Sequence, residues 1–256
     1  MERERRIVTV NDSGELGKGG FDSRQPPLFD ERGEIMGVAV LVMGPSGSGK
    51  STSLRNFKAG EIGVLNVAGK PLPFRSDIKV ADNATYQTIQ KVLRANNMRA
   101  YAIDDSQYLM GFEEMDSKKV GYDKFNSIGF NFIGLVRSIA TMTNRDTIVY
   151  FLHHTEIGDD GRTKAKTLGK LIDNHYTLEG LFSIVLLADV DKDSYTFVTQ
   201  SGGRSTAKAP MGMLPPVMDN DLKAVDTAIR SYWNMAPIVD AKEEDDTDNL
   251  EANTRL

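Results

Sequence analysis

Residues 44–51 read Gly44-Pro45-Ser46-Gly47-Ser48-Gly49-Lys50-Ser51, which fits the pattern G-x-x-x-x-G-K-[ST] in full. In such a loop the glycines let backbone amides converge on a phosphate, the lysine adds a cation, and the hydroxyl is a hard ligand for Mg²⁺. An apolar strand over 38–43 and a helix-compatible segment over 51–57 supply the flanks that the pattern requires. The sequence therefore predicts a site for a nucleoside triphosphate and magnesium, with these binding residues: Gly44, Pro45, Ser46, Gly47, Ser48, Gly49, Lys50, Ser51 and Thr52.

An acidic pair is expected beside this loop. Residues 101–103 are apolar and are followed directly by Asp104 and Asp105. We assign Ser51 and Asp104 to the magnesium shell, the acid through water, and Asp105 to orienting or deprotonating the attacking water. Lys50, Asp104 and Asp105 are therefore candidate catalytic residues. The alternative role for Asp105 is to cap the segment that follows it.

A third apolar strand ends in His153 and His154. At that strand tip a polar side chain could sense the γ-phosphate, so both histidines are further catalytic candidates. The alternative is a structural histidine, because one of two neighbours on a strand must point away.

Apolar runs and amphipathic segments alternate along the middle of the chain. Continuous apolar runs predict strands over residues 35–43, 62–67, 100–103 and 147–153. Helical spacing predicts helices over residues 86–93, 125–139 and 222–233, the last with Asn220 as its N-cap. Residues 183–190 and 195–200 flank a polar turn and predict a hairpin. The expected fold is α/β: a mainly parallel sheet sandwiched by helices, with an antiparallel hairpin at its edge.

The two ends of the chain differ in composition from the middle. Residues 1–34 mix charges and glycines without periodicity and predict a loosely ordered arm, whereas 236–256 predict a disordered acidic tail. One folded domain is expected over 35–235. Residues 1–34 carry a charge of −2 and residues 241–256 a charge of −4, so the net charge of −5 leaves about +1 for residues 35–240, which are close to neutral. A neutral domain permits local basic patches that bind nucleic acid, without predicting them.

Composition excludes several classes of protein. The chain of 256 residues has no cysteine, which excludes a disulfide framework, a zinc-thiolate site and a cysteine nucleophile. It has only three histidines, two of them adjacent, which argues against a metal site built from histidines. No apolar run is long enough to cross a membrane, and the apolar stretch at 7–10 is too short for a signal peptide. We expect a cytoplasmic protein with no membrane partner.

Rival classes of phosphate-binding loop proteins leave other signatures. A GTPase carries Asn-Lys-x-Asp for guanine, and residues 168–173 do not supply it. A small-molecule kinase carries an arginine-rich lid; Arg162 and Lys164 stand in the right kind of loop, but no paired-arginine lid is present. Adenine is therefore the expected base, by elimination.

Two long polar segments, 106–121 and 155–170, follow strand tips, where α/β proteins place their ligands. Both are expected to be loops, and their lysines and arginines suit a phosphate backbone or a neighbouring subunit's nucleotide. The alternative is a solvated loop with incidental cations. The candidates are Lys118, Lys119, Arg162, Lys164, Lys166, Lys170 and Lys208, with Arg145 and Arg204 as further cations that could act in trans.

Several motifs together resemble phage RecA-like ATP-binding proteins, a group that includes single-strand-annealing recombinases. The resemblance spans about residues 36–234, and its more specific pieces are Gly-Lys-Pro-Leu-Pro-Phe at 69–74 and Leu-Gly-Lys at 168–170. The other segments are 44–51, Ala-Ile-Asp-Asp at 102–105, His-His-Thr-Glu at 153–156, Thr-Ala-Lys at 206–208 and Asn-Asp-Leu at 220–222.

The resemblance implies a RecA-like P-loop core, ATP with Mg²⁺, assembly into a ring or filament, and single-stranded DNA as partner. It also implies that the two polar segments occupy the positions of DNA-binding loops. A single-strand-binding protein or another replication or recombination factor is a further possible partner, in the cytoplasm of a host cell.

One departure from that family affects the expected chemistry. RecA-like enzymes usually carry a catalytic glutamate at the end of the strand after the P-loop helix, and residues 66–69 here read Asn-Val-Ala-Gly. Hydrolysis then depends on Asp105 or is slow, and ATP acts more as a switch than as fuel. Two alternatives remain open: a helicase loader or other AAA+-type remodeller, and a nucleotide-gated interaction module without turnover.

Overall fold

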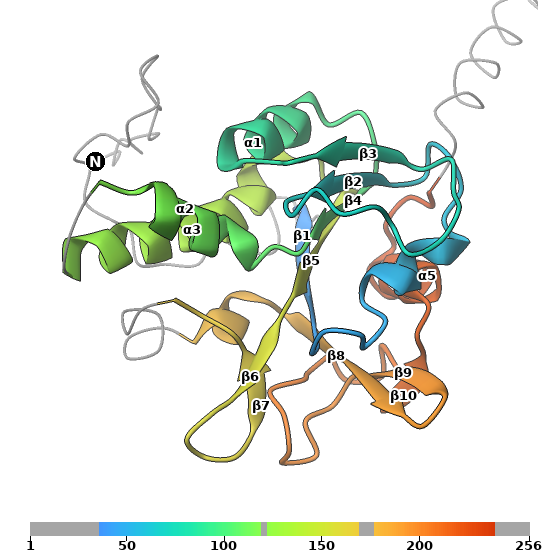
Figure 1. The fold of residues 1–256 in the computed structure, drawn as a ribbon. Coiled ribbons are helices and arrows are strands. Elements are labelled where there is room, and N and C mark those ends of the chain that lie inside the picture. Colours follow the sequence, from blue (N-terminus) through green and yellow to red (C-terminus); the bar gives the residue numbers. More distant parts are fainter. Residues whose placement is uncertain (1–35, 119–121, 169–176, 239–256) are drawn as a thin grey trace, which may run out of the picture.

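The computed structural model describes residues 36–118, 122–168 and 177–238, drawn in colour in Figure 1. The predicted arm at 1–34, the tail beyond 238, Lys119 and Lys170 lie outside these residues. The helical elements are η1 (Ser51–Asn56), α1 (Tyr86–Ala95), α2 (Tyr108–Asp116), α3 (Tyr122–Met142), η2 (Leu178–Leu181) and α5 (Leu222–Trp233). The strands are β1 (Val38–Met43), β2 (Gly63–Asn66), β3 (Lys79–Asp82), β4 (Ala100–Asp104), β5 (Ile148–His153), β6 (Thr155–Ile157), β7 (Thr163–Ala165), β8 (Ile184–Asp191), β9 (Ser194–Val198) and β10 (Val217–Asp219).

Eight strands form one sheet in the order β10-β9-β8-β1-β5-β4-β2-β3. The six strands from β8 to β3 are parallel, while β9 runs antiparallel to both of its neighbours. The predicted α/β class, the mainly parallel sheet and the hairpin at its edge are confirmed. Because β5 lies between β1 and β4, the strands that end in the phosphate loop and in the acidic pair are not neighbours.

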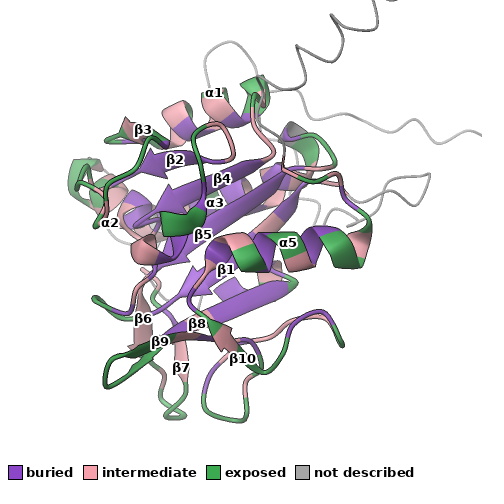
Figure 2. Cartoon of the chain, turned by 90° about the vertical axis from the view of Figure 1, so that its right-hand side faces the viewer, coloured by how far each residue is buried: buried purple, intermediate pink, exposed green. Residues whose placement is uncertain are grey.

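Alternate residues of the central strands point into two separate cores. Val38, Val40 and Val42 pack with α5 and η1 on one face, whereas Leu41 and Met43 pack with α1 and α3 on the other. This is the two-residue period of a strand that is buried on both sides. Figure 2 shows the resulting sandwich, with the buried sheet between α5 on one side and α1 and α3 on the other.

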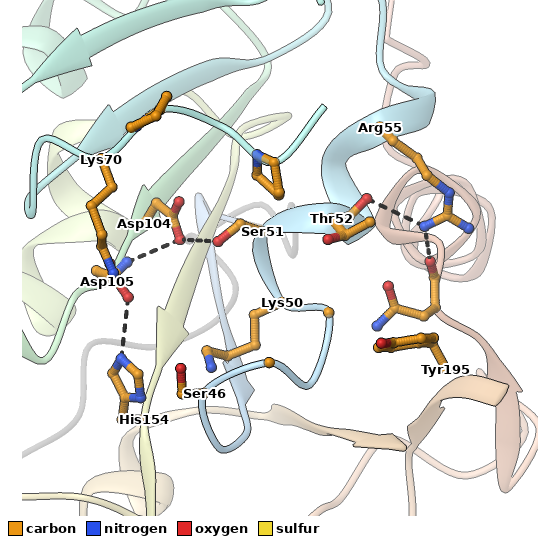
Figure 3. Close-up of a pocket in the computed structure, with 15 residues that line it drawn as sticks. Ser46, Lys50, Ser51, Thr52, Arg55, Lys70, Asp104, Asp105, His154 and Tyr195 are labelled. Atoms are coloured by element: carbon orange, nitrogen blue, oxygen red, sulfur yellow. Dashed lines mark hydrogen bonds and ion pairs between the residues drawn. The ribbon is translucent and has the colours of Figure 1, made fainter. Parts of the chain in front are cut away.

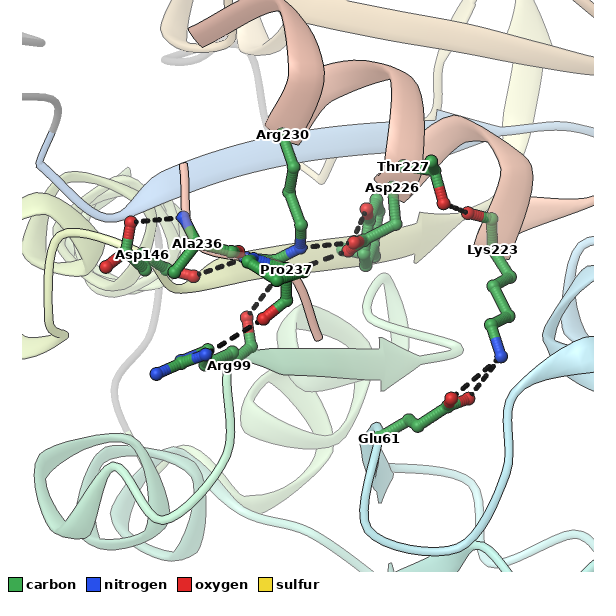
Figure 4. Close-up of polar contacts among 10 residues, drawn as sticks. Glu61, Arg99, Asp146, Lys223, Asp226, Thr227, Arg230, Ala236 and Pro237 are labelled. Carbon is green, nitrogen blue, oxygen red and sulfur yellow. Dashed lines mark hydrogen bonds and ion pairs between the residues drawn. The ribbon is translucent and has the colours of Figure 1, made fainter. Parts of the chain in front are cut away.

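The helix α5 is fixed to the amino ends of the central strands by a buried ion pair (Figure 4). Arg230 donates to Asp226 one turn away and to the backbone carbonyls of Arg99, Asp146 and Ala236. The hydroxyl of Tyr150 on β5 completes the network by donating to Asp226 at 2.8 Å. With both charges paired and bonded, the network satisfies the groups that it buries.

Three predictions about local structure are wrong. The segment after β4 is not a loop throughout, because Leu109 and Met110 are buried against the core and 108–116 form α2. The segment from 155 forms the hairpin β6–β7, whose strand β7 is bonded to residues 204–206. The N-cap of α5 is Asp221, which accepts from the amides of Lys223 and Ala224, and not Asn220.

Within the described residues, no helix is long and apolar enough to cross a membrane.

Candidate functional site

The loop after β1 closes around the side chain of Lys50. The ammonium group donates to the carbonyl oxygens of Gly44 and Pro45, both at 2.8 Å, and the residue is only 6% exposed. Gly47 and Gly49 have φ angles of +82° and +85°, which L side chains rarely adopt. The loop thus forms a cradle in which a cation already occupies the centre.

Burial lowers the pKa of Lys50 to about 8, although the nearby carboxylates of Asp105 and Asp104 partly offset the effect. A charged amine held in a poorly solvated loop gains strongly from an anion. A phosphate placed against Lys50 would supply the counter-charge that the cradle lacks.

At the edge of the cradle, Ser51 meets an acid from 53 residues further along the chain. Its hydroxyl donates to Asp104 Oδ1 at 2.9 Å. Burial raises the pKa of Asp104, and the hydrogen bond from Ser51 partly opposes this rise. The structure therefore brings together the two predicted magnesium ligands, a hydroxyl and a carboxylate. This donor set suits Mg²⁺, which uses few protein oxygens and keeps waters and phosphate oxygens for the rest of its octahedron.

Asp105 is held in an unusual position by a lysine and a histidine. Its backbone φ is +56°, and its carboxylate contacts Lys70 Nζ at 2.6 Å and His154 Nε2 at 3.2 Å (Figure 3). Burial pushes the pKa of Asp105 upward, but the hydrogen bonds from His154 and Lys70 outweigh it and bring the pKa to about 2. Asp105 is consequently ionised at neutral pH and oriented toward the cavity, and it is not the N-cap of α2, whose cap position is Gln107.

Lys70 was not predicted as a site residue. It lies on the turn after β2, and the side chain of Asn66 holds that turn by accepting from the amide of Gly69 and donating to the carbonyl of Lys70. Asn66 also donates to Asp82 on the neighbouring strand β3. RecA-like enzymes usually carry a glutamate at the end of the strand after the P-loop helix, which is β2 here. In this chain the buried side chain of Asn66 fixes the turn, and Lys70 on that turn contacts Asp105.

The two histidines have different roles. His153 is fully buried and hydrogen-bonded on both ring nitrogens, to Ser106 Oγ at 2.9 Å and to the carbonyl of Lys166 at 2.7 Å. Burial lowers the pKa of His153 to about 4, so the ring is neutral. His153 does not line the cavity and cannot act on a ligand there, which makes its assignment as a catalytic candidate wrong. His154 points the other way, into the cavity, as one of the pair had to do.

These groups line one cavity of about 610 Å³. The predicted residues among its walls are Ser46, Gly47, Gly49, Lys50, Ser51, Thr52, Asp104, Asp105 and His154. Gly44, Pro45 and Ser48 belong to the loop but do not face the cavity. Six further residues line it that sequence reasoning missed: Arg55, Lys70, Pro71, Pro73, Tyr195 and Asn220. Of these, Lys70, Pro71 and Pro73 belong to the Gly-Lys-Pro-Leu-Pro-Phe segment, the only sequence signal that pointed to them.

The predicted cations are scattered, and their charges are partly matched. On the hairpin β6–β7, Arg162 pairs with Asp160 at 2.6 Å and Lys164 with Glu156 at 3.2 Å, while Lys166 is exposed. Acids and bases balance over residues 155–168, so this stretch carries no net positive charge. Lys118 is exposed after α2, and burial lowers the pKa of Lys208. Arg145 precedes β5 and so lies at the end of the sheet away from the cavity. Arg204 lies beside the hairpin β6–β7, where its backbone carbonyl accepts from the amide of Thr163.

Comparisons with protein-family models and with curated proteins give no match. The geometry of the cavity is therefore the basis for assigning a function.

Proposed function

We propose that this chain binds ATP with Mg²⁺ in the cavity around Lys50 and hydrolyses it slowly, within a RecA-like P-loop core. The observation that carries the proposal is the contact between Ser51 and Asp104 beside the cradled amine of Lys50. A hydroxyl, a carboxylate and an ammonium group in a glycine loop are what a magnesium-bound triphosphate requires. In the same described residues no cluster of three or more acids and histidines offers a different metal site.

The position of each residue in the cavity determines the role that we propose for it. Lys50 and the loop amides would bind the phosphates, and Ser51 and Asp104 would hold the magnesium, which would supply neutralising positive charge to the phosphates. Asp105 and His154 face the same cavity and orient the attacking water. With a pKa of about 2, Asp105 is a weak proton acceptor, so it positions the water more than it deprotonates it. Turnover should accordingly be slow.

Single-stranded DNA is the polymer partner that we propose, on the strength of the family resemblance and of one contact. The amide of Lys166, at the base of the hairpin β6–β7, donates to the carbonyl of His154 at 2.9 Å. A group that senses nucleotide is thereby bonded to a segment that projects beyond the sheet (Figure 1). We propose that the chain assembles as a ring or filament and promotes annealing or recombination in phage DNA metabolism, in the host cytoplasm, with single-strand-binding or replication factors as further partners.

Calorimetry with ATP and Mg²⁺ tests the nucleotide site. Wild-type protein and the exposed-lysine control Lys58→Met should bind, and Lys50→Met should not. Binding by Lys50→Met equal to wild type would reject the proposal.

DNA binding is tested separately, with an oligonucleotide over a salt series and with or without ATP. Lys166→Glu should weaken binding and reduce its salt dependence, whereas Lys91→Glu on α1, at the other end of the molecule, should not. No affinity for DNA under any condition would remove the DNA part and leave the nucleotide site standing.

A nucleotide-gated interaction module is the second candidate function, and the Lys70–Asp105 contact favours it. If that pair stays closed with ATP bound, the carboxylate is unavailable and ATP acts only as a switch. Tight ATP binding with no measurable phosphate release, with or without DNA, would select this candidate over the slow ATPase.

A further inference from the structure

The cavity has a second end, on the other side of Lys50 from the acidic pair. Figure 3 shows Tyr195 and Arg55 at this end, well separated from Asp104 and Asp105. Tyr195 comes from β9, Arg55 from η1 and Asn220 from the segment between β10 and α5. A triphosphate bound in the loop has its γ end at the acids, so its nucleoside must leave the loop in this other direction.

Asn220 is the unexplained residue at this end. It is 2% exposed, lines the cavity, and neither its Nδ2 nor its Oδ1 has a hydrogen-bond partner in the structure. Buried amides are almost always paired, so an unpaired one needs an explanation. Helix capping does not provide it, since the neighbouring Asp221 caps α5.

The backbone of Asn220 is fixed even though its side chain is free. Its amide donates to the carbonyl of Tyr195 at 3.2 Å, and its own carbonyl accepts from Arg55 Nη1. Two separate elements, β9 and η1, thus hold Asn220 in place with an unused donor and an unused acceptor. Such a group is preorganised for a ligand that offers the complementary pair.

Tyr195 supplies a flat surface next to this amide. Its ring lies so close to Gly49 that a Cβ on that glycine would come within 2.9 Å of it, yet the residue is 49% exposed. Gly49 is therefore required both for its positive φ and for the approach of the ring. A half-open aromatic ring beside a phosphate loop is a stacking surface for a base.

We propose that Asn220 and Tyr195 form a base subsite that prefers adenine, with Tyr195 stacking and Asn220 pairing with the base edge. This inference rests on the proposed nucleotide function. The amide presents one donor beside one acceptor, and adenine offers the complement at both edges that carry its N6 amino group. At the same two edges, guanine offers it only on the Watson–Crick side, through N1–H and O6, since O6 and N7 on the other side are both acceptors. The preference for adenine, which the sequence suggests only by elimination, is thereby attributed to Asn220 and Tyr195.

The test measures three ligands on each variant: ATP, GTP and inorganic tripolyphosphate, all with Mg²⁺. Wild type should bind ATP at least about tenfold more tightly than GTP. Asn220→Ala should lose about tenfold or more in ATP affinity and less than about twofold in tripolyphosphate affinity. Asn220→Asp, which keeps only acceptors, should move the preference toward GTP. Asn234→Asp, at the far end of α5, is the control and should change none of these.

Tyr195→Ala should weaken ATP and GTP alike and leave tripolyphosphate unchanged, while Tyr195→Phe retains binding. Tyr232→Ala, a similarly exposed tyrosine on α5, is its control. A readout without nucleotide checks that the amide is unpaired: Asn220→Ala should not lower the melting temperature of the free protein. If the Asn220 variants keep the wild-type ratios of affinity for ATP, GTP and tripolyphosphate, the base subsite is overturned. A lowered melting temperature of the free Asn220→Ala protein overturns it as well. Wild-type protein that binds neither ATP nor tripolyphosphate overturns the proposed function instead.

Discussion

Replacing Lys50 by methionine should separate the stability of the loop from its ability to bind phosphate. The pKa of Lys50 falls from 10.5 to about 8 on folding because the amine is buried. At 1.36 kcal/mol per unit, this corresponds to about 3 kcal/mol of unfavourable free energy at neutral pH. The variant also loses two hydrogen bonds to backbone carbonyls, about 1 kcal/mol each. The free Lys50→Met protein should therefore be more stable than wild type by about 1 kcal/mol, or about 2–4 °C in melting temperature.

Nucleotide should reverse that order. ATP with Mg²⁺ at about 100 times its dissociation constant should stabilise wild type by about 2.7 kcal/mol and the variant not at all. Thermal unfolding with and without nucleotide measures both effects, and exposed Lys58→Met is the control.

The pH dependence supplies a further check on the Lys50 argument. Between pH 8 and 10.5 the unfolded chain holds a proton that folded Lys50 has lost, so wild-type stability should rise relative to the variant over that window. A variant that is several degrees less stable at every pH, or that is still stabilised by ATP, would refute the reasoning.

Three other changes test the rest of the site and the fold. Asp105→Asn should lower ATP turnover about a hundredfold and change ATP affinity less than threefold, as steady-state kinetics and calorimetry would show; unchanged turnover would remove Asp105 from the reaction. Lys70→Met removes a group that lowers the pKa of Asp105, so the acidic limb of the rate–pH profile should move to higher pH, whereas a merely structural lysine would leave the limb in place. Arg230→Ala should cost about 3–5 kcal/mol in denaturant unfolding because it leaves Asp226 buried without its partner. Loss of under 0.5 kcal/mol, the value expected for exposed Arg94→Ala, would contradict that network.

The sequence predicts the part of the site that lies on short, regular connections. The loop at 44–51 follows its strand directly, and Asp104 is the last residue of β4, so the sheet alone brings it to Ser51. Strand assignment was sufficient here because the carboxyl ends of parallel strands meet at one edge.

Residues placed by tertiary contacts were missed. Lys70 reaches Asp105 only because Asn66 fixes the turn at 66–70, and Asn220 reaches the cavity because Asp221 takes the capping role that either residue could fill. The helix α2 was missed for a similar reason, since its first turn is held by burial of Leu109 and Met110 and its sequence has only a weak helical period.

The closed ion pair at Asp105 has a consequence for how nucleotide could act on the protein. Lys70 Nζ contacts the carboxylate at 2.6 Å while its side chain stays largely exposed, so the lysine is free to exchange partners at little cost in packing. A γ-phosphate in the cavity carries more negative charge than a carboxylate and competes for the same cation. If Lys70 transfers to the phosphate, Asp105 keeps only His154, whose backbone carbonyl is bonded to the hairpin β6–β7. Binding of a γ-phosphate and the position of the hairpin β6–β7 would then be linked through the carboxylate of Asp105. Lys70→Met should break that link: ATP would still bind, but it would no longer change protease cleavage or hydrogen exchange in residues 155–168.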